Sequence, residues 1–322
     1  MRRYVWLVLV PVLIFGYPVG LVIGGRAGGM GGAFSGISDD ALSLYYNPGG
    51  LSSVTGGEMT VMRSQYTLVS GLTFNWISVA LKVNDKLGIG FGWLNKGAVL
   101  EENGYNEIDT TRMGDNLFTL GIGMRLNKNV GLGININRMV LSSVIGGGSG
   151  FGMDLGVLCR WPKSPVYFGF VMKNLTSGMG GETYPMVYRI GFGYKGFPRI
   201  VTRTIKKKVG EKIKRYRVKR REGYRLAFDF DLETKPWGVN GSDSLGYTEG
   251  LLHYYVGMEY NPIDIFGVRF GWNDMEGISC GLRFGWQKYL IDFSYAFQGV
   301  MDKELNIPIT GSIWKAAFTM KF

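Results

Sequence analysis

Few side chains in this sequence are suited to catalysis or to metal binding. The 322 residues include one histidine, His253, and two cysteines, Cys159 and Cys280. A Ser–His–Asp triad needs a histidine beside a nucleophile and a carboxylate, and a metal site needs several ligands together. His253 is expected instead beside Tyr255 and Glu259, as a satisfied polar residue whose titration could at most bias a pore. The pattern predicts no enzyme, no cofactor and no metal.

The remaining chemical motifs are also weak. Cys159 and Cys280 fall on the apolar faces of two segments that are not neighbours, so a disulfide between them is not expected. The many Gly-x-Gly pairs lie inside extended segments and do not complete a nucleotide-binding fingerprint. Six acids and six arginines are expected to face one another across the lumen, holding a wall or plug in place; a selective ion path is the alternative. They are Asp154, Asp229, Asp231, Glu233, Glu259 and Asp292, with Arg125, Arg160, Arg189, Arg225, Arg269 and Arg283.

Positive charge is confined to one stretch of the chain. Residues 199–221 hold 12 Lys or Arg and a single acid, Glu211, so they carry the whole formal charge of +11. The remainder is neutral, which argues against a nucleic-acid-coating protein. Ile200–Lys206 and Ile213–Lys219 interleave β-branched and basic residues, which predicts a hairpin; a solvated loop is the alternative.

This basic hairpin, placed at residues 196–221, is a candidate partner-binding surface. An acidic periplasmic partner or the cell wall would match its charge. The basic residues proposed to bind are Lys206, Lys207, Lys208, Lys212, Lys214, Arg215, Arg217, Lys219, Arg220 and Arg221.

The first 24 residues have the pattern of a secretory signal. Arg2 and Arg3 precede the apolar run Tyr4–Ile23, and Gly24 and Gly25 offer small residues for cleavage. An uncleaved membrane anchor is the alternative, weakened by two prolines within the run. No other apolar run approaches the length of a transmembrane helix. A signal of this kind points out of the cytoplasm and argues against a nucleic-acid partner.

The rest of the chain repeats with period two. Leu87, Ile89, Phe91 and Trp93 alternate with glycines, and the segment 224–233 alternates apolar residues with Arg, Asp and Glu. A soluble sandwich would bury the apolar faces, whereas a transmembrane barrel turns them to lipid. Aromatic residues at segment ends, segments of about ten residues, and a last strand ending in Phe322 favour the barrel. Phe322 resembles the signal read by the outer-membrane insertion machinery.

Fourteen strands are predicted, giving an all-β, 14-stranded antiparallel transmembrane barrel over residues 58–322. An even count lets the barrel close with both termini on one side. Tight turns such as Asn84–Asp85, Asn127–Lys128 and Asn261–Pro262 are expected at the periplasmic end, and longer connections such as 95–114 and 234–250 at the other. The expected strands are 58–66, 74–83, 86–94, 115–126, 129–141, 151–161, 165–173, 186–195, 222–233, 251–260, 263–272, 277–286, 288–298 and 312–322.

Residues 25–57, ahead of the barrel, contain the most specific motif. Ser38 or Asp39 can cap a short helix through Tyr46, which Asn47–Pro48 would end. Such a glycine-rich stretch can fold back into the barrel as a plug; a periplasmic tail is the alternative. The motif residues are Met30, Gly31, Gly32, Ala33, Phe34, Asp39, Asp40, Asn47, Pro48 and Leu51.

This motif is similar to the N-terminal signature of the FadL-like superfamily, which includes long-chain fatty acid transporters and the PorV/PorQ proteins of type IX secretion. Gly49 stands where the signature has Ala. Residues 266–272 and the chain end resemble PorV/PorQ proteins in particular. The resemblance implies a plug inside the barrel and leaves the substrate open, because the chain is short for the large external loops that build a fatty-acid groove.

Two functional hypotheses remain. One is a plugged channel in the outer membrane of a Gram-negative-type envelope that passes small apolar molecules, with a lipid-like ligand in the lumen. The other is a PorV/PorQ-like secretion-associated or structural barrel that docks a partner through the basic hairpin. In both, the lipid bilayer surrounds the barrel.

Overall fold

The computed structural model describes residues 21–67, 72–103, 108–143, 146–175, 178–179, 182–183, 186–197, 199–209, 212–222, 224–234, 252–263, 265–302 and 307–322. The predicted signal peptide therefore lies outside the described residues except for its last four positions. Among the residues described, no helix is long and apolar enough to cross a membrane.

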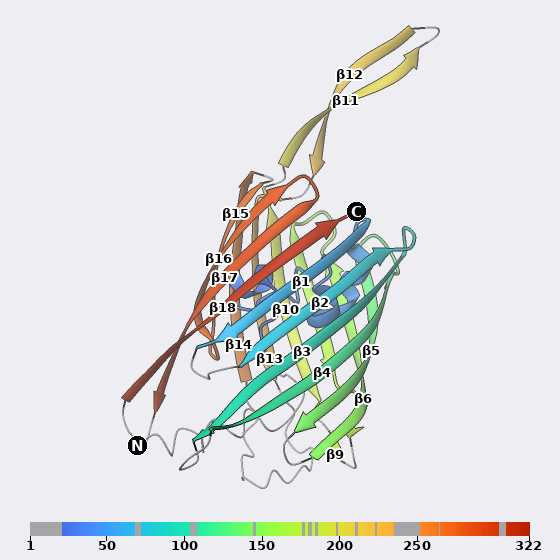
Figure 1. The fold of residues 1–322 in the computed structure, drawn as a ribbon. Coiled ribbons are helices and arrows are strands. Elements are labelled where there is room, and N and C mark those ends of the chain that lie inside the picture. The colour runs from blue at the N-terminus through green and yellow to red at the C-terminus, as the bar shows by residue number, and fades with distance from the viewer. Residues whose placement is uncertain are drawn as a thin grey trace.

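Fourteen antiparallel strands form a closed barrel, which confirms the predicted fold class. Each strand pairs with its neighbour in the chain, and β1 also pairs with β18 to close the ring (Figure 1). The strands are β1 (Gly57–Tyr66), β2 (Thr73–Lys82), β3 (Leu87–Asn103), β4 (Ile108–Arg125), β5 (Val130–Ser143), β6 (Gly146–Arg160), β7 (Val166–Lys173), β10 (Val187–Gly196), β13 (Leu226–Thr234), β14 (Leu252–Ile263), β15 (Phe266–Asn273), β16 (Gly277–Trp286), β17 (Tyr289–Asp302) and β18 (Ile307–Lys321).

Alternation along each strand sorts side chains between lipid and lumen. On β13, Asp229 and Asp231 are buried inside, whereas Phe228 and Phe230 are 42% and 36% exposed on the outer face. The same holds on β4, where Leu120 and Ile122 are among the most exposed apolar residues. An outer surface this apolar matches the lipid-facing band of a transmembrane barrel.

Short turns gather at one end of the barrel, as predicted. The side chain of Asn84 accepts hydrogen bonds from the backbone of Lys86 and Leu87, and Asn127 accepts equivalent bonds from Asn129 and Val130. Each asparagine thus builds its own turn.

Several predicted strand ends were wrong. Asn261–Pro262 lies within β14, at a register shift between Tyr260 and Ile263, and does not form the turn. At the other end of the barrel, β3 and β4 continue through most of the predicted loop 95–114, and β17 and β18 are longer than predicted. Backbone pairing continues there, for example between Glu101 and Thr110, although the apolar alternation that marks the membrane band has ended.

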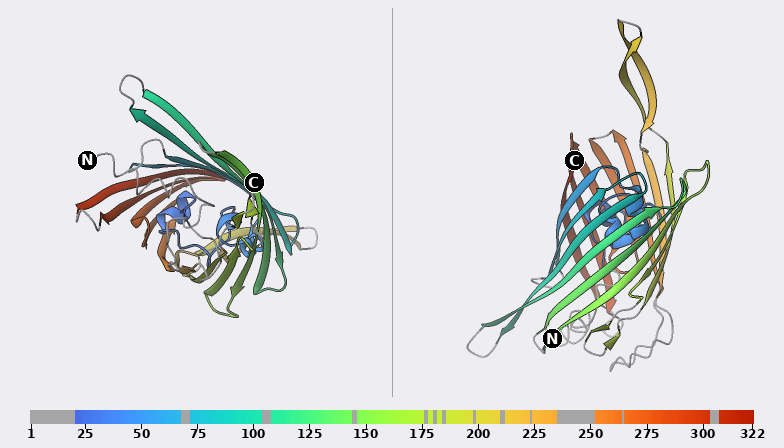
Figure 2. Two further views of the ribbon diagram at one scale, coloured as in Figure 1. Left: turned by 90° about the horizontal axis from the view of Figure 1, so that it is seen from below. Right: turned by 90° about the vertical axis from the view of Figure 1, so that its right-hand side faces the viewer.

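Two small sheets accompany the barrel. β8 (Gly178–Met179) and β9 (Glu182–Thr183) add to the edge of β6. β11 (Arg199–Val209) and β12 (Lys212–Glu222) form the predicted basic hairpin, a separate two-stranded sheet. The hairpin projects beyond the end of the barrel that carries the short turns and the C-terminus (Figures 1 and 2).

Candidate functional site: the plug and the lumen wall

Residues 22–54 fill the barrel as a plug. The segment contains α2 (Gly25–Gly29), α3 (Ser43–Tyr46) and the 3-10 helix η1 (Pro48–Ser53), and nearly every residue is buried. Viewed along the barrel axis, these turns lie inside the ring of strands (Figure 2, left). The predicted plug is therefore observed as a structural element, and the periplasmic tail is excluded.

The predicted helix within the plug begins later than expected. α3 starts at Ser43, because Ser38 donates its hydroxyl to the carbonyl of Phe34 and Asp40 accepts from the backbone of Leu42, forming local turns instead of a longer helix. Asn47 ends α3 as predicted, and its side chain then accepts from Gly49 to open η1. Gly49 consequently lies in η1.

Glycines on the inner face of the wall form the seat of the plug. A Cβ at Gly88 would lie 2.1 Å from the carbonyl oxygen of Leu51, and one at Gly133 would lie 2.1 Å from the carbonyl carbon of Pro48. On the opposite side, a Cβ at Gly271 would lie 2.1 Å from the carbonyl carbon of Met30. These approaches are shorter than any van der Waals contact, so only glycine fits. Much of the glycine content thus lets the plug backbone touch the barrel.

Arg26 connects the plug to itself and to the wall. Its guanidinium lies 2.7 Å from Asp39, 2.6 Å from Asp40 and 3.0 Å from Glu259 of β14. It also donates to the hydroxyl of Tyr224. Burial acts to raise the pKa of Asp39, but Lys195 and Arg26 outweigh it and hold that pKa below its usual range. Asp39 therefore binds Arg26 and Lys195 as a carboxylate.

Two carboxylates of β13 bind the backbone of the motif. Asp231 accepts hydrogen bonds from the amides of Phe34 and Ser35 at 2.9 and 3.0 Å, and Asp229 accepts one from Gly36 at 3.0 Å. Arg189 of β10 pairs with Asp231 at 2.8 Å. Hydrogen bonds to a buried charged group are stronger than neutral ones, so Asp231, paired with Arg189, holds the plug backbone firmly.

Arg189 and Asn273 bind two backbone carbonyls of the motif. Arg189 donates to the carbonyl of Gly32 at 2.5 Å, and Asn273 of β15 donates to the carbonyl of Gly31 at 2.9 Å. Both glycines have positive φ, 64° for Gly31 and 85° for Gly32. That left-handed backbone favours glycine and turns the two carbonyls to the wall.

The acids and arginines of the predicted ladders pair along one wall, on strands one or two positions apart, and not across the lumen. Arg269 lies 2.9 Å from Glu259 and 2.6 Å from Asp292, and Arg283 lies 3.1 Å from Asp292. Ladders on β10 and β13–β17 thus stabilise one wall, as the structural interpretation predicted.

Four members of the predicted ladders behave differently. Arg125 donates to the carbonyl of Ser52 in the plug, and Asp154 accepts from asparagine Asn137 and not from an arginine. Arg160 and Arg225 are exposed, and the Arg160 guanidinium lies over the ring of Tyr167, 5.8 Å from the ring centroid. Both lie at the turn end of their strands, where the wall meets solvent and charge needs no partner.

Tyr224 was likewise assigned to the wrong face. The predicted strand 222–233 placed it outside with Leu226, but β13 begins only at Leu226. Freed from the strand, Tyr224 turns inward and donates to Glu259 at 2.9 Å.

An apolar row lines the opposite wall. Five inward-facing residues on β1–β5 are cross-strand neighbours in succession, and all are at most 4% exposed. Tyr45 of the plug packs its ring edge against this row, 5.9 Å from the ring of Trp76. The row is Met62, Trp76, Leu94, Leu117 and Met139.

This row was not predicted, because small or charged residues were expected on the whole inner face of the barrel. A signal was present in the sequence. Trp93–Leu94 and Leu117–Phe118 are pairs of adjacent apolar residues, which place one apolar side chain on each face of a strand. On the other side of β1, the cross-strand neighbour of Met62 is Ala317 of β18, and the neighbour of Ala317 is Asp292 of β17. The apolar row therefore ends where the charged wall begins.

The remaining chemical residues stay apart. His253 lies on the inner face of β14 and shares a hydrogen bond of 2.8 Å with Asp274. Cys159 on β6 and Cys280 on β16 are both free thiols. Within the described ranges, no three His, Cys, Asp or Glu side chains gather as a metal site would require.

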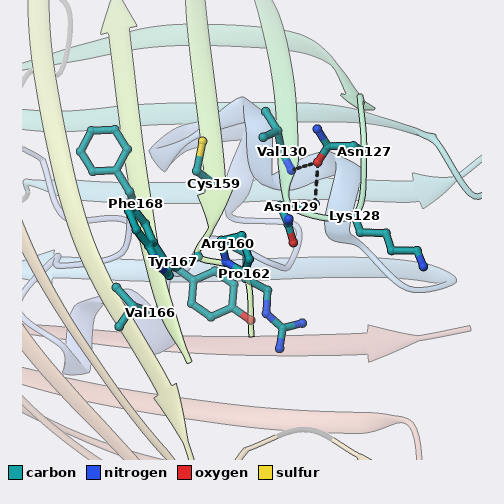
Figure 3. A pocket seen from close by; sticks show the side chains of 11 residues that line it. Asn127, Lys128, Asn129, Val130, Cys159, Arg160, Pro162, Val166, Tyr167 and Phe168 are labelled. Carbon is teal, nitrogen blue, oxygen red and sulfur yellow. Dashed lines mark hydrogen bonds between the residues drawn. The ribbon is translucent and has the colours of Figure 1, made fainter. Parts of the chain in front are cut away.

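A pocket of about 520 Å³ opens at the turn end of β5–β7. Val130, Cys159 and Phe168 line it (Figure 3). Trp161 also belongs to its lining. Trp161 and Phe168 belong to the exposed outer surface, so the pocket lies outside the lumen and away from the plug.

No family model and no curated protein matches this sequence. Among solved structures, the chain is similar to the CymD monoaromatic hydrocarbon channel, with a TM-score of 0.63 at 12% identity over 93% of this chain and 97% of that one. It is similar to the toluene transporter TodX of Pseudomonas putida, with a TM-score of 0.63 at 11% identity over 92% and 97%. The toluene transporter TbuX of Ralstonia pickettii gives 0.59 at 11% over 93% and 98%.

At these identities the likeness defines the fold. The chain is a plugged, 14-stranded transmembrane barrel of the architecture found in FadL-family channels. The FadL-like part of the predicted resemblance is confirmed for the fold, and the PorV/PorQ part stays a prediction.

Proposed function

We propose that this protein is an outer-membrane channel that passes small apolar molecules past its plug. The observation that carries the proposal is the apolar row on β1–β5, an inward-facing band that a polar-solute pore would not need. The solved structures with this fold are named as a monoaromatic hydrocarbon channel and as toluene transporters. Their named cargo matches the chemistry of the row.

The two walls suggest where passage occurs. Ion pairs and carboxylate–amide bonds hold the plug against β10 and β13–β17, whereas the row contacts it through apolar surfaces such as Tyr45 on Trp76. Apolar contacts have no preferred direction, and an apolar solute can replace them without leaving a buried charge unpaired. The proposed path therefore runs between the plug and the apolar row of β1–β5.

The row can be tested by uptake of radiolabelled toluene into cells that carry the protein in their outer membrane. Leu117→Asn places an amide in the row, and Thr119→Asn, the next inward position of β4, is the matched control because Thr119 is already polar. Desolvating an amide costs roughly 1–3 kcal/mol, so uptake through the Leu117 variant should fall about tenfold. Heat-modifiable gel mobility would verify insertion. Unchanged uptake by an inserted Leu117 variant would contradict the proposal.

The remaining assignments accompany this proposal. Residues 1–24 act as the signal peptide, residues 25–57 as the plug and residues 58–322 as the barrel. Phe322 directs the chain to the insertion machinery; its backbone pairs with Gly57 at 2.8 Å in both directions, so the last residue belongs to the closed ring. A lipid-like ligand in the lumen fits the same apolar row.

A second candidate is a PorV/PorQ-like barrel that docks a partner. The observation that favours it is the basic hairpin β11–β12, which replaces a short turn at the end of the barrel where the other turns are short. The hairpin can serve a channel equally well, so its partner is considered separately.

A further inference from the structure

The hairpin β11–β12 is a two-stranded sheet that stands clear of the barrel. Eleven residue pairs join the two strands, from Arg199 opposite Glu222 to Val209 opposite Lys212. Strands of this length reach about 35 Å. Both outer edges of the sheet are unpaired within the described part of the chain. The hairpin projects away from the barrel end in two perpendicular views (Figures 1 and 2).

The pairing places like charges opposite one another. Lys206 lies opposite Arg215, and Lys207 lies opposite Lys214. Like charges in directly opposed positions destabilise a hairpin. A bound polyanion would remove this repulsion, and the neutral remainder of the chain offers no surplus of acids to do so.

The basic residues have an order along β12. Arg215, Arg217, Lys219 and Arg221 occupy every second position and therefore share one face of the sheet. Successive members are about 6.7 Å apart along the strand. On this face the opposed positions of β11 hold Lys206, Thr204, Thr202 and Ile200, and no acid.

We propose that the free edge of β12 binds an extended acidic segment of a periplasmic protein as a third strand. Strand addition supplies backbone hydrogen bonds, and acids at alternate positions of the added strand would face the row at 215, 217, 219 and 221. The membrane around the barrel is not the partner, because electrostatic attraction to lipid decays within about 10 Å and the hairpin runs away from that membrane.

The test uses the full-length protein in detergent and a fluorescein-labelled peptide of five Glu-Val repeats, followed by fluorescence anisotropy. One variant carries Arg215→Gln, Arg217→Gln, Lys219→Gln and Arg221→Gln. The matched control carries Arg199→Gln, Arg203→Gln, Lys207→Gln and Lys214→Gln, which removes the same charge from the other face. Compared with the unmodified protein, the first variant should bind the peptide at least about tenfold more weakly, because each cross-strand charge pair adds to the affinity. The control should bind it less than about threefold more weakly.

A second measurement leaves the protein unchanged. A peptide of the same sequence with its alternate amides N-methylated keeps every charge but cannot extend a sheet, and it should lose binding about tenfold. Equal weakening by both charge variants would overturn the proposal in favour of diffuse attraction. Equal binding of the methylated peptide would overturn strand addition. Binding to phosphatidylglycerol vesicles without binding to the peptide would identify a lipid surface instead.

Discussion

The two walls of the lumen hold the same plug by different means. On β10 and β13–β17, buried arginines and carboxylates bind the plug backbone and Arg26. On β1–β5, a row of apolar side chains provides apolar contact, and the polar bonds to the plug from Glu58, Arg125 and Asn135 lie apart from this row. Directional bonds to buried charges fix a position, whereas apolar contacts exclude water but tolerate sliding. The difference assigns anchoring to one wall and passage to the other.

The largest expected effect comes from removing the main anchor. Arg26→Gln leaves Asp40 without its cation, while Glu259 keeps Arg269 and Asp39 keeps Lys195. We therefore expect the free energy that holds the plug in place to fall by about 3 kcal/mol, the lower end of the range for breaking a buried ion pair. This loss raises the population of displaced plug roughly 150-fold. Single-channel recording in planar bilayers would show this as frequent openings.

Arg283→Gln is the control for the anchor. Arg283 belongs to the same cluster but pairs only with wall residues, Asp292 and Glu259. Its loss should leave the closed state intact, and equal openings in the two variants would mean that the cluster stabilises the barrel without anchoring the plug.

The second-largest effect is expected from substitutions of the glycines that contact the plug, and it should be equal on both walls. Gly133→Val on β5 and Gly271→Val on β15 would each push a side chain into the plug backbone. Overpacking costs about 1–3 kcal/mol, so the displaced plug should become roughly 5- to 150-fold more populated. Gly114→Val is the control, because the nearest atom to its Cβ is 4.0 Å away. Sensitivity of cells to a large antibiotic would measure the leak; no difference from the control would contradict the seat.

The smallest effect concerns pH. Asp39 has a pKa held below its ordinary value of 3.8, so its contribution to plug stability is fully present above that value and is lost as pH falls towards the lower folded pKa. Conductance should therefore be constant from neutral pH down to about 5 and rise only in stronger acid. Asp39→Asn should remove that part of the acid response. A rise between pH 5 and 8 would show that another group controls the anchor.

The strands and turns of the barrel were predictable from the sequence because each depends on local pattern. The alternation of Phe228 and Phe230 with Asp229 and Asp231 predicts a strand, and it also predicts which side chains lie on the apolar face and which on the charged face. The plug was predictable as a segment from its motif. The turn asparagines Asn84 and Asn127 were predictable for the same local reason.

The division of the lumen into two walls was not predictable in this way. It depends on which residues of five strands become neighbours once the barrel closes, as in the succession from Met62 to Met139. The inward turn of Tyr224 depends on Arg26 and Glu259, which are distant in the chain. Contacts that form only when the barrel closes cannot be predicted from the residue pattern of a single strand.

The division of labour between the walls can be tested by locking the plug to each wall in turn. In a background with Cys159→Ser and Cys280→Ser, Gly28→Cys with Ser294→Cys would join the plug to the charged wall at β17, where the Cβ atoms would be 3.5 Å apart. Gly131→Cys with Ser52→Cys would join it to β5, where they would be 3.2 Å apart. Both spacings are close to that of a disulfide.

Toluene uptake before and after reduction of each disulfide is the decisive measurement. Locking the plug to β17 restrains a contact that does not open during the proposed passage, so uptake should change less than about twofold. Locking it to β5 should stop uptake, and dithiothreitol should restore it. Unimpaired uptake with the β5 lock, together with loss of uptake with the β17 lock, would contradict the assignment of anchoring and passage to the two walls.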